Sequence, residues 1–165
     1  MTMRRYMRGQ AVSYIYGMVS SRIFLSAFFS WFVAQLIKLA VETVKGEHRG
    51  SRDVLTTLVW KTGGMPSSHS SLVTGIATSI GFIYGVGNPL FTLALFYGML
   101  TIRDALGVRR AAGAQARELN RIGLQLNRDY GIQFKPVKEV NGHTPAEVAV
   151  GVLLGFFMGM AFSLL

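Results

Sequence analysis

Four apolar runs constrain the fold of this chain more than any other feature of its sequence. They cover about residues 23–41, 66–86, 89–108 and 144–165. Each is close to the ~20 residues that an α-helix needs to cross a bilayer. In hydrocarbon, a segment must satisfy its backbone hydrogen bonds internally, as a helix does. The runs predict an all-α fold, a polytopic transmembrane helical bundle of about four spans forming one domain over residues 23–165.

Composition agrees with a membrane protein and excludes several classes of function. Half of the 165 residues are hydrophobic and only 15% are charged. This charged fraction is too low for a typical soluble domain. The net charge of +9 would suit nucleic acid, but the basic residues flank the apolar runs. This placement favours anionic lipid headgroups or topology signals, so we expect the membrane and no nucleic acid as a partner. The chain has no cysteine, which excludes disulfides and a thiol nucleophile.

Two further segments are expected to lie outside the spans. Residues 1–22 carry four arginines around a short mixed run, and we interpret them as a basic interfacial lead-in. Residues 111–130 place Leu119, Ile122 and Leu126 on one helical face and arginines elsewhere, which is the pattern of an amphipathic helix. Such a helix either lies on the membrane or covers the end of the bundle.

The distribution of basic residues predicts the topology. With four spans, the two long connectors share one side of the membrane and the termini share the other. The connector side holds 13 lysine and arginine residues, and the terminus side holds four. Because basic residues favour the cytoplasm, we expect an integral protein of the cell membrane with its connectors in the cytoplasm. The basic N-terminus opposes this assignment.

The sequence Gly-Gly-Met-Pro-Ser-Ser-His-Ser opens the second span with polar groups. Pro66 suits the first position of a helix, and the free N–H groups after it, at the positive end of the helix dipole, form a site for anions. Ser67 and Ser68 would add hydroxyl donors, Lys61 a charge, and His69 a proton near neutral pH. At a membrane surface, the corresponding ligand is a phosphate carried by a lipid. The alternative is an ordinary capped membrane helix.

The first span carries polar side chains near its connector end. Gln35 and Lys38 lie three residues apart, and Glu42 follows Lys38 by four, so these side chains are neighbours on one helix surface. Polar groups at this depth are costly and usually face a protein interior or an aqueous cavity. Alternatively, the long side chain of Lys38 reaches back to the membrane surface. We favour the inward orientation, in which Lys38 helps to bind phosphate.

The last span provides the candidate nucleophile. Glu147 follows His143 by four residues, a spacing at which the carboxylate can orient the imidazole and make it more nucleophilic. His69, from the second span, would protonate the leaving oxygen. These roles describe phosphoryl transfer through a covalent histidine.

Further cations near the connector side complete the predicted site. Arg109 and Arg110 are expected to bind the phosphate and to stabilise the charge that develops on it. Arg103 and Asp104 are expected to support them, with Asp104 either bracing a site arginine or simply pairing with Arg103. The acidic residues and histidines lack any recognisable metal-ligand spacing, so we expect no metal and no other cofactor. His48 is expected to be exposed in a polar loop.

Two stripes of small residues predict close helix–helix contacts. They recur every four residues, at Ser67, Ser71, Gly75 and Ser79 in the second span and at Gly151, Gly155 and Gly159 in the last. The glycine contact lies either within one chain or between two chains, and a homodimer through this face is one interpretation.

Several segments resemble a known family and occur in its order. They are Ala34–Lys38, Gly63–Ser70, Asp104–Arg110 with Gly113 and Gln115, and Gly142–Val148. They resemble the divergent branch of the type 2 phosphatidic acid phosphatase superfamily, also described as acid phosphatase/vanadium-dependent haloperoxidase-related. The resemblance covers about residues 23–165. It implies a small helical membrane protein related to enzymes that dephosphorylate lipid phosphates or pyrophosphates without a metal.

The chain departs from the motifs of the wider superfamily. Pro66-Ser67-Ser68-His69 has serine where the superfamily has glycine, and no Lys-x6-Arg-Pro motif is present. His143 with Glu147 resembles the end of the third motif, but the Ser-Arg pair is missing upstream. An arginine from another helix would then supply that charge.

The leading hypothesis is a membrane lipid phosphatase that hydrolyses a lipid phosphate or pyrophosphate ester by histidine catalysis. One alternative is a non-enzymatic protein that binds or translocates lipid phosphates. The other is a structural membrane protein.

Overall fold

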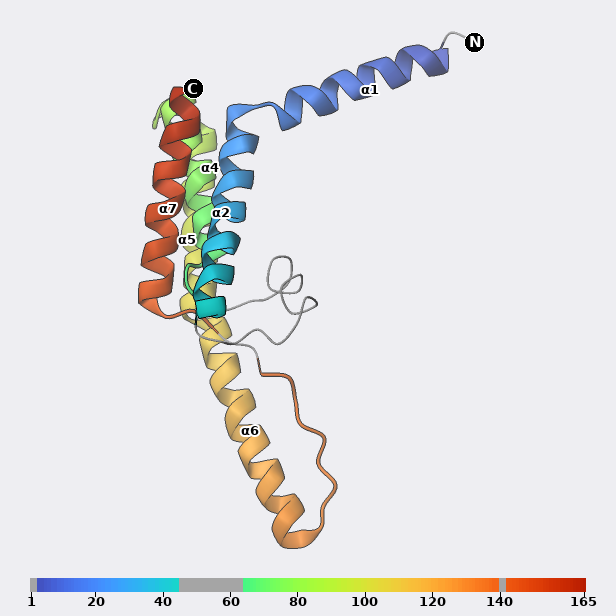
Figure 1. Ribbon diagram of the computed structural model, residues 1–165, viewed down its shortest axis with the longest axis vertical. Coiled ribbons are helices and arrows are strands. Elements are labelled where there is room, and N and C mark those ends of the chain that lie inside the picture. The colour runs from blue at the N-terminus through green and yellow to red at the C-terminus, as the bar shows by residue number, and fades with distance from the viewer. Residues whose placement is uncertain (1–2, 45–63, 140–141) are drawn as a thin grey trace.

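The computed structural model describes residues 3–44, 64–139 and 142–165, and all regular structure in these ranges is helical (Figure 1). The elements are α1 (Met3–Val19), α2 (Arg22–Val44), α4 (Ser68–Tyr84), α5 (Pro89–Leu106), α6 (Val108–Tyr130) and α7 (Pro145–Leu164). The predicted all-α membrane bundle is confirmed. Lys61 and His48 lie outside the described residues.

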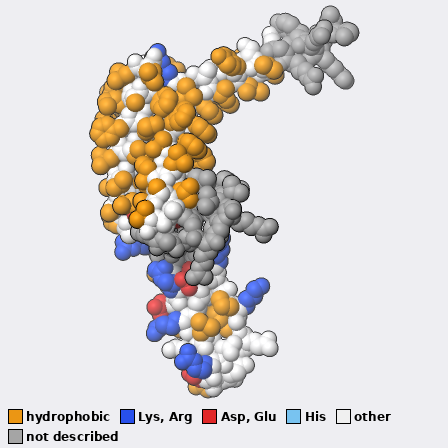
Figure 2. All heavy atoms as spheres, in the orientation of Figure 1, with side chains coloured by type: hydrophobic (Ala, Val, Ile, Leu, Met, Phe, Trp, Pro, Cys, Tyr) orange, Lys and Arg blue, Asp and Glu red, His pale blue; other side chains and the backbone are white. Residues whose placement is uncertain are grey.

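Four helices, α2, α4, α5 and α7, run alongside one another as an elongated bundle in which α4 is central (Figure 1). By length and apolar composition, α2, α7 and the continuous stretch from α5 into α6 can each cross a membrane. With 17 residues, α4 lies at the lower limit for a span. Hydrophobic side chains cover the bundle in Figure 2 and basic side chains gather below it, as expected for a surface that faces lipid.

The contact between α4 and α7 is the closest in the bundle because glycines line it. Gly151, Gly155 and Gly159 are buried. A Cβ at Gly155 would overlap the carbonyl oxygen of Ser71, and a Cβ at Gly159 would lie 2.8 Å from the carbonyl oxygen of Gly75. The glycine face is therefore occupied by α4 of the same chain. The interpretation of this face as a homodimer interface is wrong.

Serine hydroxyls join the helices inside the bundle. Ser71 donates to the carbonyl of Ser30 at 2.9 Å, and Ser26 donates to the carbonyl of Gly75 at 3.0 Å, which ties α2 to α4. In lipid, small residues let backbones approach and such hydrogen bonds add to the packing. The packing role predicted for the serine stripe of α4 is confirmed.

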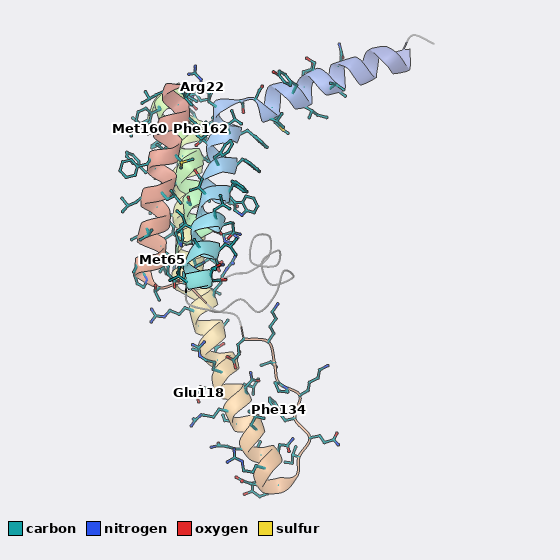
Figure 3. All side chains as sticks on the ribbon, viewed as in Figure 1. Arg22, Met65, Glu118, Phe134, Met160 and Phe162 are labelled. Atoms are coloured by element: carbon teal, nitrogen blue, oxygen red, sulfur yellow. The ribbon has the colours of Figure 1, made fainter. Side chains whose placement is uncertain are left out.

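At the terminus end of the bundle, α2 and α7 are also joined. Phe29 stacks on Phe162 with ring centroids 5.1 Å apart, and Arg22 donates to the carbonyl of Ser163 at 3.4 Å. Figure 3 labels Arg22 and Phe162 at this end. From here α1 leaves the bundle and touches only α2 among the described elements (Figure 1).

Side-chain caps set the start of α4, and they correct one expectation. Ser67 is the N-cap, and its hydroxyl accepts from the N–H of Ser70. Pro66 therefore lies one residue before the cap and is not the first helical residue. A serine oxygen at the cap accepts from an otherwise unpaired helical N–H. A proline at the first helical position lacks an N–H, so it leaves one fewer donor unpaired but accepts no hydrogen bond from the helix.

The predicted amphipathic helix is present as α6, but it does not cover the end of the bundle. It continues beyond that end roughly in line with α5 (Figure 1). The segment 131–139 returns along it: Phe134 packs on Gly123, and Asn120 exchanges hydrogen bonds of 3.0 and 2.9 Å with Val137. Figure 3 labels Phe134 between this segment and α6. The return segment therefore partners one face of α6 outside the bundle.

Candidate functional site

The N-termini of α4 and α7 meet at the connector end of the bundle, where α2 ends. The N–H of Ser67 donates to the carbonyl of Glu147 at 3.0 Å, and Gly151 packs directly on the carbonyl of Ser67. Each helix N-terminus carries partial positive charge and unpaired N–H groups. Two of them together make this end of the bundle favourable for an anion.

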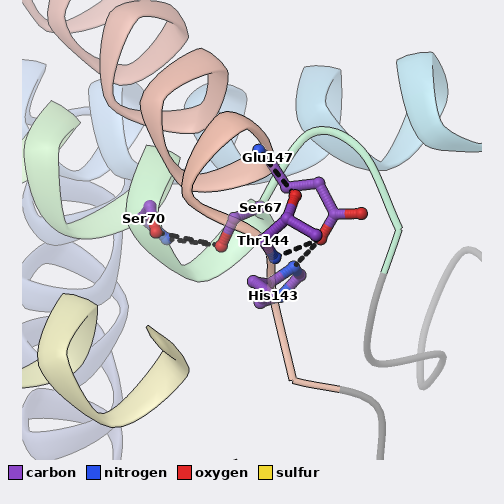
Figure 4. Close-up of polar contacts among 5 residues, drawn as sticks. All are labelled: Ser67, Ser70, His143, Thr144 and Glu147. Atoms are coloured by element: carbon purple, nitrogen blue, oxygen red, sulfur yellow. Dashed lines mark hydrogen bonds and ion pairs between the residues drawn. The ribbon is translucent and has the colours of Figure 1, made fainter. Parts of the chain in front are cut away.

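His143 lies two residues before the first residue of α7, beside Glu147 (Figure 4). Its Nδ1 is 3.1 Å from Oε2 of Glu147, the contact expected from their spacing. The same oxygen accepts from the N–H of Thr144 at 3.0 Å, and Thr144 Oγ1 accepts from the N–H of Glu147 at 3.3 Å. This capping box holds the carboxylate in place. Glu147 thus both starts the helix and orients the imidazole.

The backbone of His143 is fixed as well. Its N–H donates to the carbonyl of Ala105, at the end of α5, at 3.2 Å. The preceding Gly142 packs against the backbone of Arg110 so closely that a Cβ would collide with it. The residue is only 6% exposed. These contacts bring the loop before α7 onto the junction between α5 and α6.

His69, the second residue of α4, gathers charged groups from several elements. It is exposed, and Arg109, His143, Lys38 and Asp104 all lie near enough to interact with it electrostatically. Arg109 is itself bound through Nε to the carboxylate of Asp104 at 2.6 Å. Asp104 therefore pairs with Arg109 rather than with Arg103, and its support of a phosphate-binding arginine stays a prediction.

Lys38 points into the protein, as favoured, and is 2% exposed. Its side chain and that of Glu42 lie over Gly64, where a Cβ would be 3.2 Å from Lys38 Cε and 3.4 Å from Glu42 Oε1. Gly64 has a φ of 85°, which glycine adopts at little cost. Paired glycines before a helix start are a sequence signal for such a close approach, although no role was predicted for Gly64.

Ser67 does not present its polar groups to a ligand. Its N–H is bonded to Glu147, and its hydroxyl is fully buried and accepts from both the N–H and the hydroxyl of Ser70, the latter at 2.9 Å (Figure 4). The expected contact between Ser67 and phosphate is therefore not retained. The N–H groups of Ser68 and His69 follow at the first turn of α4, where helices have no internal acceptor for them.

Two arginines lie less centrally than expected. Arg103 is exposed and borders a shallow depression with Leu106 and Gly107. Arg110 is also exposed, and its backbone N and Cα and its Cβ pack against the loop before α7. Among the described residues, no group of three or more acidic or histidine side chains is arranged to hold a metal.

Fold and site together define a class of protein: a helical membrane protein with a histidine–carboxylate pair and cations where its helix N-termini converge. Comparison with known proteins places the chain more closely. The sequence pattern of the divergent PAP2 family matches residues 19–158, and the chain belongs to this family.

A curated relative of the chain is the uncharacterized membrane protein YuiD of Bacillus subtilis (strain 168). The two sequences are 34% identical over 150 residues, and the match covers 84% of this chain and 92% of that protein. No solved structure matches the chain. The matched residues include every helix of the bundle except the last turns of α7.

Proposed function

We propose that this protein hydrolyses a lipid phosphate or pyrophosphate ester through a covalent phosphohistidine on His143. The observation that carries the proposal is the contact of His143 Nδ1 with Glu147, beside His69 and Arg109. A carboxylate on Nδ1 leaves Nε2 as the nucleophilic nitrogen. Membership of the divergent PAP2 family supports the reaction class.

In the proposed first step, Nε2 of His143 attacks phosphorus and the bond to the lipid oxygen breaks. His69 donates a proton to that oxygen, so the lipid leaves as an alcohol, or as a phosphate when the substrate is a pyrophosphate. In the second step, a water attacks the phosphohistidine, and His69 accepts its proton. Inorganic phosphate is released and both histidines return to their initial states.

The charge on the phosphoryl oxygens requires fixed donors and cations. We assign this task to Arg109, braced by Asp104, to Lys38, and to the N–H groups of Ser68 and His69. Lys61 and Arg110 stay predicted phosphate-binding residues, and Arg103 a predicted supporting residue. Of these cations Lys38 is buried, and a charge in surroundings of low dielectric constant interacts with phosphate more strongly than one in water.

Phosphate release from purified protein in detergent, offered a panel of lipid phosphates, tests the proposal. His143→Ala is expected to abolish release, and His69→Ala to reduce it by about 10²–10⁴-fold. Arg121→Ala is a matched control for Arg109→Ala, because Arg121 is exposed on α6 and pairs with Glu118. The control should keep full activity, and Arg109→Ala should lose most of it.

Acid-labile labelling of His143 by a radioactive lipid phosphate would identify the covalent intermediate. Release that is unchanged in both histidine variants would overturn the mechanism. If no lipid phosphate is hydrolysed but lipid phosphates still bind, the protein is a binder or translocator. If neither occurs, the structural alternative remains.

A further inference from the structure

A pocket of about 670 Å³ lies along the bundle between α4, α5 and α7. Its size falls within the range of small-molecule sites. Small residues on the facing helices create the space, and the lining is apolar except for two threonines. The small residues are Ala77 and Gly81 on α4 and Ala94 and Gly98 on α5.

One end of this pocket reaches the proposed phosphate site. Val73 lines it one helical turn after His69, and Ile102 lines it directly before Arg103 and Asp104. Val152, which follows Glu147 by five residues, closes this end from α7. The apolar pocket and the charged site are therefore consecutive along the same helices.

The pocket runs along most of the bundle, from Val73 and Ile102 near the connector end to Val86 in the turn between α4 and α5. Along α5 it extends from Phe91 to Ile102, and at 1.5 Å per residue this is ~16 Å. This length is about half of the ~30 Å thickness of a bilayer's hydrocarbon core, which is enough to hold much of one lipid chain. Met99 and Phe156 on its rim are 56% and 42% exposed, so the pocket opens sideways towards lipid.

We propose that this pocket binds the hydrocarbon chain of a lipid phosphate drawn from the leaflet on the connector side. The inference rests on the proposed function for the position of the phosphate. A lipid in that leaflet has its headgroup at the bundle end and its chain directed towards the midplane, which is the direction of the pocket. The chain enters laterally between α5 and α7, and the phosphate meets His69 and Arg109.

Filling the pocket tests the proposal through chain-length preference. Ala94→Phe places a ring in the space between α4 and α5. It should lower kcat/KM for dodecyl phosphate by roughly tenfold, as other changes in apolar substrate pockets do, and leave hydrolysis of ethyl phosphate unchanged. Ala161→Phe is the matched control, because Ala161 is exposed on α7 and does not line the pocket. Equal effects of both variants on dodecyl phosphate would overturn the proposal.

Photolabelling gives a second measurement that needs no turnover. The probe is a dodecyl phosphate with a diazirine at mid-chain, and the control probe is the corresponding alcohol. The phosphate probe should label the α5 peptide containing Ala94 and Met99 in preference to exposed Phe28 and Leu36 of α2, and Ala94→Phe should abolish that preference. Equal labelling of both faces would overturn the pocket. Preferential labelling without hydrolysis would keep the pocket and overturn the proposed activity.

Discussion

At the scale of the residue, His143 is oriented by its side chain and its backbone together. Glu147 contacts Nδ1 at 3.1 Å, and the carbonyl of Ala105 accepts the backbone N–H at 3.2 Å. The carboxylate therefore favours the tautomer with its proton on Nδ1 and a lone pair on Nε2. An imidazole held in this way needs little reorganisation before it attacks phosphorus.

Glu147→Gln separates the charge of this carboxylate from its hydrogen bonds. The amide oxygen can still accept from Thr144 and His143, so we expect the protein to fold with a melting temperature near that of the wild type. The negative charge that stabilises a positive imidazole is lost, and kcat should fall by about 10²-fold. Phosphate release and thermal unfolding in detergent measure the two effects. Glu118→Gln, at an exposed ion pair on α6, should change neither. A variant that unfolds, or one with full kcat, would contradict this role.

Asp104→Asn tests the support of Arg109. The carboxylate binds Arg109 Nε at 2.6 Å, and both side chains are partly exposed. Without the charge, the guanidinium should adopt several orientations and bind phosphate less well. We expect KM to rise several-fold with a smaller change in kcat, since positioning is lost and the nucleophile is intact. Steady-state kinetics with a lipid phosphate decides this. An effect confined to kcat would contradict a positioning role.

Short-range spacing predicted which residues contact each other better than it predicted which polar groups a ligand could reach. The separation of four residues between His143 and Glu147 predicted their contact. The depth of Lys38 in its span favoured the inward orientation of its side chain. The loss of Ser67 from the anion site was not predictable, because its N–H is taken by a carbonyl on another helix. That bond depends on the register between α4 and α7, which neither helix encodes alone.

At the scale of the element, the contact of α4 with α7 determines where the site residues lie. Gly151, Gly155 and Gly159 bring the two backbones together, and their N-termini then meet at Ser67 and Glu147. The stripe of glycines predicted a close contact, but the same pattern serves partners within a chain and between chains. The helix α4 is the partner of α7 because it carries a complementary stripe of small residues.

Gly155→Ala should therefore loosen the bundle. The added Cβ would overlap the carbonyl of Ser71 and lie 3.0 Å from the nitrogen of Gly75, and backbone atoms cannot move aside as a flexible side chain can. We expect a loss of about 1–3 kcal/mol, typical of overpacking, measured by unfolding in mixed micelles. Gly17→Ala in α1, with nothing within 4 Å of its Cβ, is the control and should not destabilise. An unchanged unfolding midpoint for Gly155→Ala would contradict the packing described.

The position of α6 shows where helix patterns stop being informative. Its apolar and basic faces predicted an amphipathic helix, and α6 spans Val108–Tyr130. Amphipathicity does not specify what the helix covers. The structure pairs one face with the return segment, through Phe134 on Gly123 and Asn120 with Val137. These contacts join residues more than ten positions apart and have no periodic signal.

At the scale of the whole molecule, charge and helix direction determine which side of the membrane the site faces. Both the C-terminus and the start of α2 lie at the end of the bundle opposite to α6 (Figure 1). The connector end carries the two histidines of the site, and α6 with its return segment adds five cations beyond it, Arg117, Arg121, Arg128, Lys135 and Lys138. From the positive-inside bias we predict that the site faces the cytoplasm.

Single-cysteine labelling tests this topology directly, because the chain has no cysteine of its own. The cysteines replace Glu118 on α6 and Leu165 at the C-terminus. The native side chains at these positions are 62% and 82% exposed. A membrane-impermeant maleimide should label Leu165→Cys in intact cells and Glu118→Cys only after the membrane is opened. Leu153→Cys, on the lipid-facing surface of α7, should be labelled in neither state. The reverse pattern would place the site and its substrate in the outer leaflet, and would contradict the dominance of the connector charges over the basic N-terminus.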